Sequence, residues 1–135
     1  MRFMLLQNYA ATETVTKPMS EWTPDEIKAH IAHQVRINEE LVERGELVEA
    51  QGLAGPEHAK VVTHDGVGAP VVTDGPFPEA KEFLAGYRVV DVESLDRAIE
   101  IAAEGSAAPG PGGAPIKQEI EVREVMAIPS VHEVP

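Results

Sequence analysis

The stretch at residues 83–105, FLAGYRVVDVESLDRAIEIAAEG, decides the fold, because it reads as a β-strand that runs directly into an α-helix. Residues 83–92 are mostly apolar, as expected of a buried strand, and Gly86 is typical of a bulge or a close backbone approach. Ser94 can cap a following helix, which Gly105 would end. The apolar face of that helix would hold Leu95, Ala98, Ile99 and Ala102.

A second strand–helix unit opens the chain. Residues 2–9 form a short apolar, β-compatible run, which predicts the first strand. Thr23 is a good helix N-cap and Pro24 suits the first helical position, so the helix should begin there and run to about Arg44, with Gly45 as its stop. On a helical wheel the apolar face comprises Ile27, Ile31, Val35, Leu41 and Val42.

Shorter elements follow both units. Residues 46–53 predict a strand after the first helix, and two β-prone runs at 60–63 and 70–73 predict a hairpin around a turn-rich segment. Residues 116–126 alternate between apolar and polar side chains, which predicts a last strand with one apolar face. The segment 106–115, SAAPGPGGAP, is too rich in Pro and Gly to pack and reads as a flexible loop.

The order of these elements is β-α-β, a hairpin insertion and β-α-β. This is the split βαβ order of an α+β, ferredoxin-like fold, with a four-stranded antiparallel sheet and both helices on one face. Residues 1–126 would form this single domain, and residues 127–135 a C-terminal tail. The other face of the sheet would be bare and partly apolar, so we expect a homodimer that covers it.

Composition excludes several classes of function. The 135 residues are 43% hydrophobic, enough for a core, and the formal net charge of −12 argues against direct binding to nucleic acid or to an anionic membrane. The absence of cysteine excludes disulfides, thiolate nucleophiles and Cys-ligated metal sites. The N-terminal apolar run is too short for a signal peptide, and no run approaches the ~20 apolar residues of a membrane span. We therefore expect a cytoplasmic protein.

Two segments resemble a known family. Asp74-Gly75-Pro76-Phe77, followed by E-x-K-E at residues 79–82 and by Gly86-Tyr87, is similar to the signature of the DGPF-domain proteins, which belong to the YCII-related family of the dimeric α+β barrel superfamily. Residues 120–123 resemble the closing strand of this family, although Glu124 stands where the family has proline. The resemblance covers nearly the whole chain, and it implies a ferredoxin-like monomer that pairs through its sheet.

What the resemblance implies about activity is less specific. Most members have no known biochemistry, but YCII relatives are thought to use a helix-borne histidine with a nearby aspartate in a cleft. A few relatives act on chlorinated aromatic hydroxyquinones, and some DGPF genes accompany extracytoplasmic-function sigma factors. The expected function is thus a cofactor-free His–Asp hydrolase or lyase acting on a small, aromatic substrate. The alternatives are a non-catalytic small-ligand-binding or regulatory module, and a cofactor-free oxygenase.

Three residues are candidates for this chemistry. Asp74 begins the DGPF turn, where its carboxylate can cap backbone N–H groups; the alternative is that it lies at a cleft rim and orients a histidine or a substrate. His30 and His33 lie on the first predicted helix, and a neutral imidazole suits general acid–base catalysis. The wheel favours His30, whereas the family's pattern, a histidine about a dozen residues before Gly45, favours His33, to which we lean. We expect no metal or cofactor, because the two histidines have no identifiable third ligand.

Overall fold

The chain folds into a four-stranded antiparallel sheet, two α-helices and a separate two-stranded hairpin within residues 1–75 and 82–126, the part that this structure, a computed structural model, describes. In chain order these elements are β1 (Arg2–Ala10), α1 (Pro24–Glu43), β2 (Leu47–Gly52), β3 (Ala59–Thr63), β4 (Val71–Gly75), β5 (Glu82–Asp91), α2 (Leu95–Ser106) and β6 (Ile120–Glu124). Short 3-10 turns lie at Met19–Glu21, Pro56–His58 and Pro111–Gly113.

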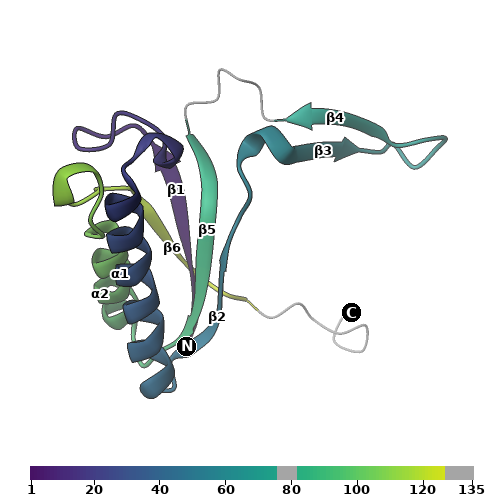
Figure 1. The fold of residues 1–135 in the computed structure, drawn as a ribbon. Helices are drawn as coiled ribbons and strands as arrows, with labels where there is room; N and C mark the ends of the chain where they lie inside the picture. The colour runs from purple at the N-terminus through teal and green to yellow at the C-terminus, as the bar shows by residue number, and fades with distance from the viewer. Residues whose placement is uncertain (76–81, 127–135) are drawn as a thin grey trace.

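The sheet has the strand order β2-β5-β1-β6, and every neighbouring pair of strands is antiparallel. Both helices lie against one face of this sheet (Figure 1). This is the strand order of a ferredoxin-like fold, so the predicted fold class is confirmed. β1 and β5 pair along their whole length, from Arg2 opposite Asp91 to Ala10 opposite Glu82.

A bulge interrupts the pairing of β1 with β5 between Gln7 and Asn8. Gly86 lies opposite Gln7 at this point, and a Cβ atom on Gly86 would lie 2.8 Å from the carbonyl oxygen of Gln51 on β2. The predicted close backbone approach at Gly86 is therefore confirmed. Because a side chain at Gly86 would clash with β2, the sheet carries no side chain at this point, where β1, β5 and β2 lie side by side.

Both helices begin where their capping residues predict. The Thr23 side chain accepts a hydrogen bond from the Glu26 N–H, and the Glu26 carboxylate accepts one from the Thr23 N–H, which forms a capping box. Gly45 adopts a φ of 70° just after α1 and allows the chain to leave the helix. Ser94 caps α2 through the Arg97 N–H. The predicted end of α2 at Gly105 is wrong, since the helix continues to Ser106.

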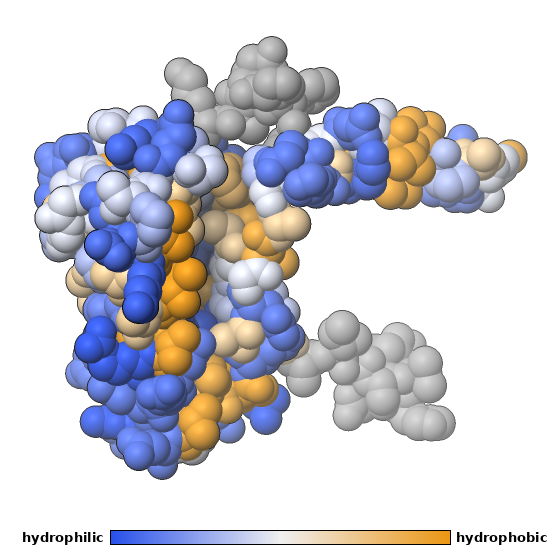
Figure 2. Space-filling view, viewed as in Figure 1, coloured by the Kyte–Doolittle hydropathy of each residue, from blue (hydrophilic) through white to orange (hydrophobic). Residues whose placement is uncertain are grey.

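The face that α1 buries is rotated from the predicted one. Its buried residues are His30, Ile37 and Leu41. Ile37 and Leu41 pack with Phe3, Leu5 and Val90 of the sheet and with Ile101 of α2. Three residues assigned to the apolar face stay exposed: Ile31 (51%), Val35 (46%) and Val42 (63%). The apolar arc of α1 is wider than the face that meets the sheet, and the remainder forms an apolar band along the helix (Figure 2).

The helix α2 shows the same effect. Ala98, Ile101, Ala102 and Gly105 are its buried residues, whereas Leu95 and Ile99, which the sequence assigned to the apolar face, are about half exposed. Three of these four buried residues are alanine or glycine, which lets α2 lie close to the sheet. A Cβ atom on Gly105 would lie 3.0 Å from the side chain of Ile120, so Gly105 serves close packing and does not end the helix.

The Gly- and Pro-rich segment after α2 is packed, and the prediction of a flexible loop is wrong. Ala108 and Ile116 are buried with Val15 and Trp22 in a second apolar cluster. Backbone bonds from Gly110 to Ala114 and from Ile116 to Ala108 hold the segment in a closed loop. β6 begins only at Ile120, later than predicted. Glycine and proline here shape a tight turn whose few apolar side chains cover the end of the sheet.

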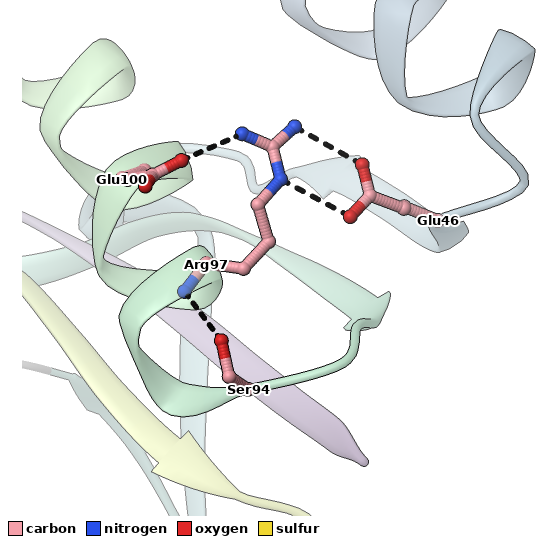
Figure 3. A network of polar contacts seen from close by, with 4 residues as sticks. All are labelled: Glu46, Ser94, Arg97 and Glu100. Carbon is pink, nitrogen blue, oxygen red and sulfur yellow. Dashed lines mark hydrogen bonds and ion pairs between the residues drawn. The ribbon is translucent and has the colours of Figure 1, made fainter.

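An ion-pair network links α2 to the start of β2. The Arg97 guanidinium donates two hydrogen bonds to the Glu46 carboxylate, at 3.1 and 3.0 Å, and a third to Glu100 at 3.1 Å (Figure 3). The side chains of Arg97 and Glu46 are both mostly buried. Glu46 directly follows the stop residue of α1, so the network joins the ends of three elements.

The β3–β4 hairpin extends away from the sheet and the helices (Figure 1). Val61, Val62, Val71 and Val72 of the hairpin are all about half exposed. The predicted hairpin is confirmed, with Val62 opposite Val72. An isolated two-stranded hairpin is at best marginally stable in water, so we expect the β3–β4 hairpin to be stabilised by packing against another surface.

Candidate functional site

A cavity of about 310 Å³ lies between α1 and the sheet. Leu5, Gln7 and Tyr9 of β1 contribute to its floor, and residues of α1, β5 and the closed loop after α2 contribute to its walls. The sheet positions at this end are small or polar, as Gln7 and Gly86 show, and so they do not fill the space beneath the helix. The rest of the interface, around Leu41 and Val90, is packed solid.

Arg88 lies in the wall of this cavity at an inward-facing position of β5. The residue is only 8% exposed. Its Nε donates to the Asn38 side-chain oxygen at 2.7 Å, and its Nη2 donates to the Gln34 side-chain oxygen at 2.6 Å. Burial lowers the pKa of the Arg88 guanidinium, and the field of Glu104 opposes this effect. An arginine keeps its charge in proteins, so the wall carries a buried cation with neutral partners.

His30 lies in the same wall and is 7% exposed. Its Nδ1 donates to the Pro109 carbonyl at 3.0 Å, and its ring meets Trp22 edge-on with centroids 5.6 Å apart. Burial lowers the pKa of His30 and outweighs the hydrogen bond to Pro109, which raises it; the charges of His33 and Arg88 lower the pKa further. The ring is therefore neutral at pH 7. With its proton held on Nδ1, its Nε2 is left as a hydrogen-bond acceptor and base.

His33 lies outside the cavity wall, on the side of α1 that meets α2. Its Nε2 donates to the Glu104 carbonyl at 2.9 Å, which ties the two helices together. Of the two histidines between which the sequence left a choice, the structure thus places His30 at the cavity, as the wheel favoured, and not His33, to which the family's pattern leaned.

Asp74 lies within β4 on the projecting hairpin. It is exposed and forms an ion pair with Lys60, its cross-strand neighbour on β3. Asp74 does not line the cavity, so the structure brings it together with neither histidine of its own chain. The rest of the DGPF motif, Pro76 and Phe77, lies outside the described residues, as do residues 78–81.

Gln118 adds a second polar group to the cavity wall. It is 3% exposed, and its side-chain oxygen accepts a hydrogen bond from the Ala10 N–H at 2.8 Å. Its Nε2 is buried and has no hydrogen-bond partner among the described residues. A buried amide without a partner is costly, so this group stands out as a donor for something that enters the cavity.

The sequence reading missed Arg88, Gln118 and Trp22, although signals for them exist. Arg88 interrupts the apolar run at 83–92, at the alternation that also places Val90 inward. Gln118 stands on the apolar side of the alternating segment 116–126. A charged or amide residue at an inward-facing strand position is a sign of a polar site in a core. Trp22, the single tryptophan, has no such local signal.

Comparison of the sequence with known proteins assigns the chain to a family. Residues 1–125 match the family model of the YCII-related domain. An uncharacterised protein of Rhizobium meliloti (strain 1021) is 33% identical to this chain over 92 residues, which cover 68% of this chain and 71% of that protein. Within residues 1–75 and 82–126, no helix is both long and apolar enough to cross a membrane.

Proposed function

We propose, from the premise that the chain belongs to the YCII-related domain family, that it binds a small molecule in the cavity between α1 and the sheet. The observation that carries this proposal is the wall of the cavity, where a buried cation, a neutral histidine and an unpartnered amide converge on apolar surface. Small-molecule sites have this composition: mostly apolar walls with a few placed polar groups. The volume suits a compact ligand.

A second candidate function, cofactor-free acid–base catalysis, is favoured by one feature of His30. The Pro109 carbonyl fixes the proton on Nδ1, so Nε2 can accept a proton from a bound substrate or water, and the same carbonyl stabilises the charged ring that results. A hydrolase or lyase needs this kind of group. The His–Asp pair expected from the sequence would have to be completed by Asp74 of a second copy, because the hairpin leads away from its own α1 (Figure 1).

We also propose that the protein is a homodimer that covers the outer face of the sheet. Met4 and Leu6, half-buried in the single chain, face away from the helices at the centre of this face, beside Val89, which is already buried. Around them lie polar pairs: Tyr87 donates to Glu49 at 2.9 Å, and Arg123 lies 3.5 Å from Glu121. An apolar centre with a polar rim is the usual anatomy of a protein interface.

Ligand binding can be tested by NMR, because the chain has one tryptophan and it lines the cavity. A library of compact molecules is titrated while the Trp22 indole N–H and the His30 ring signals are followed. We expect binders to shift both signals and to leave His64, on the distant hairpin, in place. A library whose binders move only residues outside the cavity, or that yields no binder, would refute the proposed function.

A further inference from the structure

We propose that the ligand of the cavity is a compact organic acid whose carboxylate is bound by Arg88. This inference rests on the proposed binding function and specifies its ligand class. No described residue forms an ion pair with Arg88, although Glu104 lies near enough for its field to act on the guanidinium.

Arg88 is a buried cation whose partners are all neutral. Charged side chains are rarely buried unless they are paired, because the loss of hydration is costly. Within residues 1–75 and 82–126 no aspartate or glutamate forms an ion pair with Arg88, and none lines the cavity. The chain carries 23 acidic residues, so acidic side chains are abundant, yet none of the described ones lines this wall. A ligand carboxylate would supply the missing charge.

The guanidinium is held in position for such a ligand. Asn38 and Gln34, one turn apart on α1, occupy Nε and Nη2. Nη1 forms no hydrogen bond with a described residue, so its two N–H donors remain for a ligand oxygen. Gly105 of α2 borders Nη1, since a Cβ atom there would lie 3.5 Å from it. Charge-assisted bonds from arginine to carboxylate are among the strongest polar contacts in proteins.

The remaining wall defines the rest of the ligand. Arg88 is the one cationic side chain among the described residues that line the cavity, which matches one carboxylate better than a phosphate dianion. The aromatic rings of Trp22 and Tyr9 would pack against an apolar body. Gln118 and Arg88 lie at different points along β1: Gln118 bonds to Ala10, whereas Arg88 pairs with Leu5, five positions earlier. The Nε2 of Gln118 would therefore donate to a ligand oxygen remote from the carboxylate.

The test compares acids with their primary amides, which keep the shape and lose the charge. The probes are benzoate, 4-acetylbenzoate and hexanoate, each with its amide, titrated by NMR into the full chain. We expect at least one acid to bind at least tenfold more tightly than its amide and to shift the Trp22 and His30 signals. The net charge of −12 disfavours unspecific attraction of anions, so such a preference would report the buried cation.

Arg88→Gln should abolish the preference for the acid, and Lys28→Gln, which removes an exposed positive charge from α1, should retain it. Since a buried unpaired charge costs stability, Arg88→Gln should melt at the wild-type temperature or above. If that variant does not fold, the acid–amide comparison on the wild type decides. Equal binding of acids and amides at the cavity would overturn the organic-acid inference and leave the binding function standing. An acid preference that survives in a folded Arg88→Gln variant would also overturn it. If no probe and no library compound shifts Trp22, both proposals fail.

Discussion

The ring proton of His30 is held on Nδ1, because the Pro109 carbonyl can only accept a hydrogen bond. Burial against Trp22 favours the uncharged ring, so Nε2 is a base at neutral pH. His33, three residues later on α1, donates to the Glu104 carbonyl and acts as a link between helices. Two histidines of one helix thus differ in chemistry because they contact different elements.

The lowered pKa of His30 predicts a dependence of stability on pH. The unfolded chain binds the His30 proton near the ordinary pKa of about 6.5, whereas the folded chain binds it only at lower pH. The unfolded state therefore holds more protons below about 6.5, and stability is lost as the pH falls through that value towards the folded pKa. We expect the free energy of unfolding to fall more steeply between pH 7 and pH 5 in the wild type than in His30→Asn.

Asparagine suits this comparison because it can donate to the Pro109 carbonyl and does not titrate. Urea unfolding at several pH values measures the difference, and His64→Gln, on the distant hairpin, serves as the control that should follow the wild type. Identical pH slopes for the wild type and His30→Asn would contradict the burial of an uncharged ring.

At the scale of elements, the meeting of β1, β5 and β2 depends on Gly86. A methyl group there would lie 2.8 Å from the Gln51 carbonyl oxygen and 3.3 Å from the Gly52 Cα, and both are backbone atoms that cannot rotate away. We expect Gly86→Ala to lower the free energy of unfolding by about 1–3 kcal/mol, in the range of other overpacked sites. Gly52→Ala is the matched control: Gly52 pairs with Gly86, and nothing lies within 4 Å of its Cβ position. Denaturant melts that rank the two variants equally would refute the steric argument.

The Arg97–Glu46 pair is the second test at this scale. Both side chains are mostly buried, and the guanidinium makes two bonds to one carboxylate (Figure 3). Arg97→Met leaves Glu46 without its partner, and we expect a loss of about 1–3 kcal/mol in the free energy of unfolding. Lys117→Met removes an exposed partner of Glu13 and should change the melting temperature little. Similar losses in both variants would show that the buried network has no special role.

Local signals predicted the elements well, because each depends on residues a few positions apart. The capping box joins Thr23 to Glu26, and the strands follow runs of apolar residues. The prediction of which helix face is buried was wrong where it depends on partners distant in sequence: the positions of the sheet and of α2 determine which face of α1 is buried. The cavity was not predicted for the same reason, because its wall depends on contacts such as that of Arg88 with Gln34, which is 54 residues away in sequence. Of the candidate site, His30 was identified, but the residues around it were not.

At the scale of the whole molecule, the described helices cover one face of the sheet and none of them covers the other. The helices cover the inner face, whereas Met4 and Leu6 on the outer face are only half-buried within the single chain. The hairpin and the apolar band on α1 add further exposed apolar surface (Figure 2). Contiguous exposed apolar surface is typical of an interface. Its outer-sheet part repeats in any second copy, so two copies can pair through it symmetrically.

Pairing through the sheet predicts a mass of about 29 kDa in light scattering at micromolar concentration, twice the 14.5 kDa of the chain. Leu6 lies at the centre of the outer face, so a buried charge in Leu6→Glu would have no partner there, and this variant should run as a monomer. Leu95→Glu adds the same charge at an exposed position on α2, on the other side of the molecule from this face, and should remain a dimer. A wild type of 14.5 kDa would remove the dimer and with it the route by which a second copy's Asp74 could reach a histidine. A dimer that persists in a folded Leu6→Glu variant would instead assign the pairing to another surface, such as the apolar band of α1.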